Sequence, residues 1–143
     1  MNIRINFSDV FARVDMLTAY EGAKNTADPT AYNRVWATSG AAELLLPFFI
    51  ECTSELFDNI KDFGTYSTAN NNVTFDLTLP TRLQNKYLNN NVLTALFTDY
   101  YVYYLLSKWY LIAQKDIAKT YSEIAQGKLQ HIIQTLYFKQ QPE

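Results

Sequence analysis

The sequence predicts a mainly α-helical fold, a small bundle of about four helices with one β-strand or short β-hairpin arm between the second long helix and the C-terminal helices. Apolar residues recur at three- and four-residue spacing over most of the 143 residues, as in half-buried helices. One short stretch instead alternates apolar and polar residues, as a strand does. The length fits a single helical domain, residues 1–143, which can bury roughly 70% of its unfolded surface.

The first predicted helix runs from Ser8, a good N-cap residue, to about Glu21, with Gly22 as its stop. Its apolar stripe has helical spacing and consists of Val10, Val14, Leu17 and Tyr20. The following stretch, residues 23–38, is mixed in composition. Asp28-Pro29 favours a short helix there, because proline is tolerated at the first helical position.

A second, longer helix is predicted from about Gly40 to Phe63, with Gly64 as its end. Pro47 lies inside this pattern and is expected to kink the helix or to mark its effective start. The apolar stripe keeps a three- to four-residue spacing and contains Leu45, Phe48, Phe49, Cys52, Leu56, Ile60 and Phe63.

The strand prediction covers Val73 to Leu79, which alternates apolar and polar residues until Pro80 ends it. The preceding residues 69–72 have the sequence of a turn, so residues 65–68 are the candidate hairpin partner. The candidate β-arm is therefore residues 65–80. A hairpin alone is marginal in water, so we expect it to pack on helices or on another subunit.

Two further helices are predicted between Val92 and Phe138, with a joint near Gln114 to Asp116. Residues 139–143 are a short C-terminal tail. The most apolar stretch, residues 93–112, is interrupted by polar and charged residues, so we interpret it as a buried helix rather than a membrane span.

Composition excludes several classes of function. The net charge is −2, which is unfavourable for gripping nucleic acid, and we expect neither sequence-specific nucleic-acid binding nor membrane binding. One cysteine and one histidine exclude zinc-finger patterns and catalytic schemes that need two histidines. Phosphate-binding and nucleophile-elbow motifs are also missing from the sequence. We therefore predict no catalytic residues, no metal, no cofactor and no enzyme.

Two groups of residues are candidates for other roles. Tyr100 to Tyr110 carries aromatic side chains on all sides of one helix. This pattern suits either a protein-binding surface, as in a small binding module or regulator, or a central helix buried by its own domain. On the second helix, four carboxylates share one face: Glu51, Glu55, Asp58 and Asp62. A solvated face is the ordinary interpretation, and a cation or shared-proton site is the alternative.

The order of elements resembles a known class of viral proteins. The segments that carry the resemblance are, in chain order, residues 18–24 (TAYEGAK), 44–48 (LLLPF), 73–79 (VTFDLTL), 107–110 (SKWY), 118–121 (AKTY) and 136–138 (LYF). This order is similar to small helical phage and prophage proteins of Bacteroides-type bacteria, and more broadly to the head–tail connector (adaptor) proteins of tailed phages. The resemblance spans most of the chain, as an order of elements rather than a diagnostic motif.

The resemblance implies a structural virion protein that forms a ring, expected to be dodecameric, in the phage neck between portal and tail. Its partners would be other copies of itself, the portal, and tail or other neck proteins. It would be found in the virion, and in the host cytoplasm during assembly.

The resemblance also implies roles for particular residues. The strand, the aromatic helix and the C-terminal end would contact a neighbouring subunit or the portal, through Val73, Phe75, Leu77, Leu79, Tyr101, Tyr103, Trp109, Tyr137 and Phe138. An acidic channel lining is expected in such a ring, because like charge lets DNA pass without sticking. Glu51, Glu55, Asp58 and Asp62 are the candidates for that lining.

Overall fold

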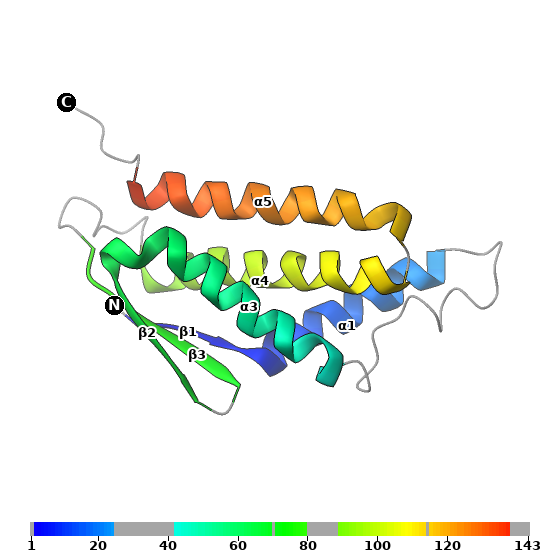
Figure 1. The fold of residues 1–143 in the computed structure, drawn as a ribbon, viewed down its shortest axis with the longest axis horizontal. Helices are drawn as coiled ribbons and strands as arrows, with labels where there is room; N and C mark the ends of the chain where they lie inside the picture. Colours follow the sequence, from blue (N-terminus) through cyan, green and yellow to red (C-terminus); the bar gives the residue numbers. More distant parts are fainter. Residues whose placement is uncertain (1, 25–41, 70, 80–88, 114, 138–143) are drawn as a thin grey trace.

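The protein was studied as a computed structural model, which describes residues 2–24, 42–69, 71–79, 89–113 and 115–137. These residues form four α-helices and a three-stranded antiparallel sheet (Figure 1). The predicted mainly α fold with a small β element is therefore confirmed. The short helix predicted within residues 23–38 and the tail 139–143 fall on residues outside, or largely outside, the described ranges.

The sheet has the strand order β1-β3-β2, with β1 (Asn2–Asn6), β2 (Gly64–Ala69) and β3 (Asn72–Leu77). The hairpin of β2 and β3 was predicted, and Asn71 in its turn has φ 65°, a conformation that asparagine tolerates. β1 was not predicted. It pairs with β3, from which it is distant in sequence, and it makes β3 the middle strand.

Alternation divides the sheet into an apolar and a polar face. Ile3, Phe75 and Tyr66 lie side by side in one row across the three strands, on the face that is covered by helices. The next row, Arg4, Thr74 and Ser67, lies on the opposite, polar face. The strand signal in the sequence arises from this one-sided burial.

Two helices follow strands or turns closely. α1 (Phe7–Lys24) starts directly after β1 and continues past Gly22, the predicted stop. α3 (Ala42–Ile60) is followed by the 3₁₀ turn η2 (Lys61–Phe63) and ends at Gly64, as predicted. Pro47 lies inside α3 at an exposed position, so the helix begins before it.

The last two helices form an antiparallel pair, α4 (Asn90–Ala113) and α5 (Lys115–Tyr137), joined near the predicted position (Figure 1). Asn89 caps α4, because its side-chain oxygen accepts a 3.0 Å hydrogen bond from the Val92 amide. Gly127 lies within α5 at an exposed position and does not break it. None of the helices in the described ranges is long and apolar enough to span a membrane.

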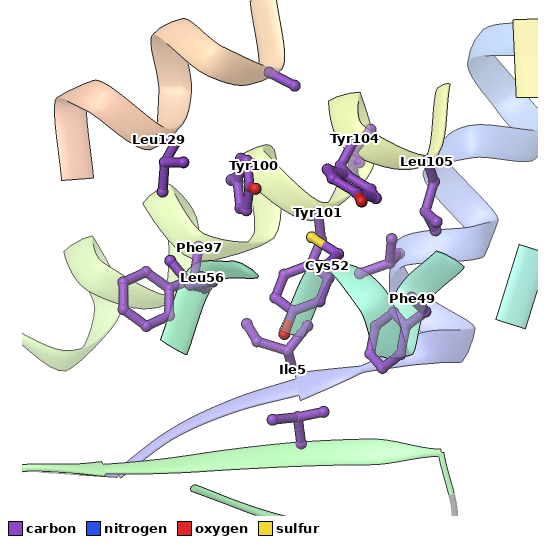
Figure 2. Packing of buried hydrophobic residues seen from close by; sticks show 14 of the residues in the cluster. Ile5, Phe49, Cys52, Leu56, Phe97, Tyr100, Tyr101, Tyr104, Leu105 and Leu129 are labelled. Carbon is purple, nitrogen blue, oxygen red and sulfur yellow. The ribbon is translucent and has the colours of Figure 1, made fainter. Parts of the chain in front are cut away.

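The core is formed where α4 lies between the other helices and the sheet. Figure 2 shows Tyr100, Tyr101 and Tyr104 of α4 beside Cys52 and Leu56 of α3, with Ile5 of β1 nearby. Tyr100, Tyr101 and Tyr110 have no exposed surface. The two interpretations of the aromatic helix are thus resolved in favour of a central helix that is buried by its own domain.

Candidate functional site

Most of the side chains predicted to contact a neighbour are instead in the core. Val73, Phe75, Leu77, Leu79 and Tyr101 are each 3% exposed or less. The prediction that they form an interface is wrong for the folded chain, because alternate residues of the middle strand and of the central helix point into the domain. The β-arm is likewise not a free arm, since β3 pairs on both sides.

The other members of that set are half-buried or undescribed. Tyr103 stacks on Tyr121 at a ring-centroid distance of 6.1 Å, and the ammonium group of Lys128 lies 5.6 Å from its ring. Tyr137 packs edge-on against Phe63 at 4.9 Å. Trp109 packs partly against the core, and Phe138 lies outside the described residues. A continuous aromatic surface between Tyr100 and Tyr110 is therefore not formed.

The four candidate channel carboxylates are exposed on α3 and η2, as the sequence predicted. Three of them accept hydrogen bonds from tyrosine hydroxyls of α4 and α5. Tyr104 donates to Glu51 at 2.6 Å, Tyr100 to Glu55 at 3.5 Å and Tyr137 to Asp62 at 3.3 Å. This row fastens α3 and η2 to α4 and α5 in addition to facing solvent. Its use as a channel lining stays a prediction.

Burial sets the protonation of the groups behind this row. It raises the pKa of Tyr100 and of Tyr104 far above the ordinary tyrosine value, and the neighbouring carboxylates act in the same direction. These hydroxyls therefore stay protonated at neutral pH and remain donors. Burial also raises the pKa of the Cys52 thiol, which makes Cys52 a packed side chain rather than a nucleophile. Within the described ranges no group of three or more His, Cys, Asp or Glu residues could hold a metal ion.

A hollow of about 430 Å³ lies between α3 and the β2–β3 hairpin. Leu46, Phe49 and Ile50 of α3 line one side of it, and Tyr66 and Thr68 of β2 line the other. Ile50 is 60% exposed and Tyr66 is 37% exposed. All of the residues that line the hollow are uncharged. The helical stripe in the sequence missed this feature, because Ile50 lies off the stripe and the position of the hairpin was unknown.

Beside the hollow, β2 is an edge strand of the described sheet, with a row of backbone groups turned outward. The Thr78 amide donates to the Phe63 carbonyl at 2.7 Å, which fixes the phase of the β2–β3 ladder. Hydrogen-bonded pairs alternate in an antiparallel ladder, so Thr65 and Ser67 bond to β3. Gly64, Tyr66 and Thr68 therefore direct their N–H and C=O groups away from the sheet.

We call the outward backbone of β2 together with the hollow the β2 edge site; its residues are Leu46, Phe49, Ile50, Gly64, Tyr66 and Thr68. It combines unpaired strand groups with an uncharged, largely apolar hollow, which suits an extended protein segment better than a small polar ligand. Comparisons with protein-family models, with curated proteins and with solved structures find no match to this chain.

Proposed function

We propose that this protein is a non-enzymatic structural subunit that assembles with neighbouring subunits through the β2 edge site. One observation carries the proposal: β2 is an open edge strand without the usual protection. Proteins protect exposed edges with charges, proline, bulges or covering segments. Residues 63–75 contain neither a charged residue nor a proline, and Thr65 to Ala69 are exposed.

The apolar hollow supports the same proposal. A strand added beside β2 would place alternate side chains over Leu46, Ile50 and Tyr66, because side chains in a strand alternate between the two faces of the sheet. Burying the exposed part of Ile50 would contribute stabilisation roughly in proportion to the apolar area removed from water. Backbone hydrogen bonds and apolar burial would then act together at one site.

The assembly that the sequence resemblance implies is the head–tail connector ring of a tailed phage, and we include it in the proposal. In that setting Glu51, Glu55, Asp58 and Asp62 would line the channel, and the protein would contact the portal and tail. The contact between subunits would use the β2 edge site rather than the buried side chains of β3. Support for the phage setting comes from the order of elements alone.

Sedimentation velocity of the full chain over a wide concentration range tests the proposal. We expect a discrete species larger than the monomer, and we expect it to persist at high salt, because no charge lies in the β2 edge site. Electron micrographs of that species would show whether it is a ring. A strict monomer at all concentrations would contradict the proposal.

The variant Thr68→Pro provides the matched test of the site. The Thr68 amide points away from β3, so proline at this edge position removes one outward donor and leaves the ladder with β3 intact. The variant should melt like the wild type and sediment as a monomer. Unchanged assembly in Thr68→Pro would show that another surface joins the subunits.

A further inference from the structure

We infer that β2 pairs with β2 of a second copy, antiparallel about a two-fold axis that passes beside Tyr66. The inference rests on the proposed function, because it uses the same β2 edge site and names its occupant. Each copy contributes a three-stranded sheet, so the dimer would contain one continuous sheet of 3 + 3 = 6 strands. The order across it would be β1-β3-β2 followed by the partner's β2, β3 and β1.

The phase of the ladder restricts the register of this pairing. Only Gly64, Tyr66 and Thr68 turn their backbone groups outward, so only these residues can form hydrogen-bonded pairs across the new edge. Placing Tyr66 opposite the partner's Tyr66 brings Gly64 opposite the partner's Thr68. All outward N–H and C=O groups of both strands are then paired. Moving the axis to Gly64 or to Thr68 leaves two of these three residues without a partner on β2.

The side chains fit the same register. Tyr66 lies on the helix-covered face of the sheet, 4.8 Å from the Phe57 ring and 5.9 Å from the Phe75 ring by centroids. The two-fold axis would bring the two Tyr66 rings together. Gly64 has no side chain to compete for the space beside the partner's Thr68. Ile50 lines the hollow next to this edge, so two copies of α3 would approach each other across the axis and cover it.

The charge distribution also favours a second copy as the occupant. A two-fold axis places residues near it opposite their own copies, so any charge there would meet a like charge. The uncharged run from residue 63 to residue 75 avoids that repulsion. On α3 the carboxylates Glu51 and Glu55 bond to tyrosines of α4 and do not line the hollow.

Pairing of β2 with the partner's β1 is less favourable. The outward carbonyl of Asn2 already accepts a 2.6 Å hydrogen bond from Asn90, and Arg4 places a charge in the middle of β1. A β2–β2 contact is isologous and closes on itself. A larger assembly, a ring included, would therefore consist of dimers joined at a second surface.

Cysteine cross-linking tests the register. A hydrogen-bonded antiparallel pair has its Cα atoms about 5.5 Å apart, which a disulfide can bridge. We expect Tyr66→Cys to give a covalent dimer with a mild oxidant. Thr65→Cys is the matched control: it faces the partner's Ser67, and its own copy is two residues out of register, at ~8 Å, which is too far. The wild type is the second control, since its one cysteine, Cys52, is buried.

Sedimentation of two proline variants completes the test. We expect the wild type to form a monomer–dimer equilibrium and Thr68→Pro to weaken it by at least about tenfold, because two symmetry-related hydrogen bonds are lost. Ser67→Pro removes an inward amide instead and should lower the melting temperature of the monomer. In the wild type, exchange of the Tyr66 and Thr68 amides with solvent should slow as the concentration rises, while the Ser67 amide is protected throughout.

The outcomes separate the inference from the proposed function. An assembly larger than a dimer that is lost in Thr68→Pro, without a Tyr66→Cys cross-link, would overturn the inference and leave the proposed function standing. An assembly that is unchanged in Thr68→Pro, or a strict monomer, would overturn both. A Thr65→Cys cross-link as efficient as that of Tyr66→Cys would contradict the two-fold register.

Discussion

The two edges of the sheet belong to strands of similar length, yet the molecule treats them differently. The outward backbone of β1 belongs to Asn2, Arg4 and Asn6, because the Phe7 amide bonds to the Asn71 carbonyl at 3.1 Å and fixes the ladder phase. The Asn2 carbonyl is capped by Asn90, Arg4 carries a charge, and Asn6 leads directly into α1. The outward groups of β2 have no such cover among the described residues.

This difference shows that neighbouring helices, rather than strand composition, determine which edge is closed. Both edge strands are rich in small or polar residues. β1 packs against α4 and α1, and its Ile3 and Ile5 are buried. β2 contacts only part of α3, so its exposed residues and the hollow beside it remain available. An unprotected edge is a hazard unless a partner covers it, which is why we assign the assembly role to β2.

The largest expected difference between the two edges comes from truncating one residue on each side of Phe75. Ile3 and Tyr66 lie opposite Phe75 in the same row, but Ile3 is 0% and Tyr66 37% exposed. Ile3→Ala should lower the free energy of unfolding by about 2–5 kcal/mol, because it leaves a cavity in the core. Tyr66→Ala should cost the monomer about 2 kcal/mol or less, through its lost aromatic contacts.

Urea unfolding at a concentration where the protein is monomeric measures both values. Equal costs for the two substitutions would show that the β2 edge is as deeply integrated into the core as β1. The distinction between a closed and an open edge would then fail.

A glycine at the start of β2 gives the next largest effect. A Cβ atom on Gly64 would lie 1.9 Å from the backbone oxygen of Asp76 on β3, and neither backbone can move aside cheaply. Gly64→Ala should therefore destabilise the protein by about 2 kcal/mol, as overpacking does. Gly127→Ala is the matched control, since nothing lies within 4 Å of its Cβ position and it sits inside α5. That change should stabilise the protein by up to about 1 kcal/mol.

Thermal unfolding of the two variants should give shifts of opposite sign. A Gly64→Ala protein as stable as the wild type would mean that β2 can separate from β3 at this point. The β2 edge would then be looser than the register indicates.

The parts of the fold that the sequence predicted are those governed by local pattern. The asparagine-rich turn and the alternation of Val73 to Leu79 predicted the hairpin, and regular apolar spacing predicted the four helices. β1 was missed because its five residues are short and its partner strand is distant in sequence. Gly22 did not stop α1, because a glycine costs a helix only about 1 kcal/mol and packing can offset that cost.

The candidate site was harder to predict than the fold. Aromatic residues on every side of α4 are equally compatible with a surface and with a core, and only the positions of α1, α3, α5 and the sheet distinguish the two. The β2 edge site depends on backbone direction and on a neighbouring helix, neither of which is encoded in residue type. Its one readable signal was the uncharged run from residue 63 to residue 75.

Removing the cap on β1 should have a moderate effect. Asn90→Ala deletes the 2.6 Å hydrogen bond to the Asn2 carbonyl and should cost about 1 kcal/mol. Asn59→Ala is the control, because Asn59 donates only to the Glu55 carbonyl on the exposed face of its own helix. Hydrogen exchange should quicken at the Ile3 and Ile5 amides in Asn90→Ala and not in Asn59→Ala. Identical exchange in both variants would show that Asn90 does not hold the β1 edge.

The smallest effect is expected from neutralising β1, and it separates charge from cover as the cause of protection. Arg4 is exposed in the row with Thr74 and Ser67, so Arg4→Thr should change the free energy of unfolding by no more than about 0.5 kcal/mol. The measurement belongs in the Thr68→Pro background, where the β2 edge is blocked and any association must come from elsewhere. We expect Arg4→Thr/Thr68→Pro to remain monomeric, because Asn90 and the start of α1 still cover both ends of β1. Association of the double variant would show that one charge, rather than the neighbouring helices, keeps β1 closed, and the difference between the two edges would then reduce to a single side chain.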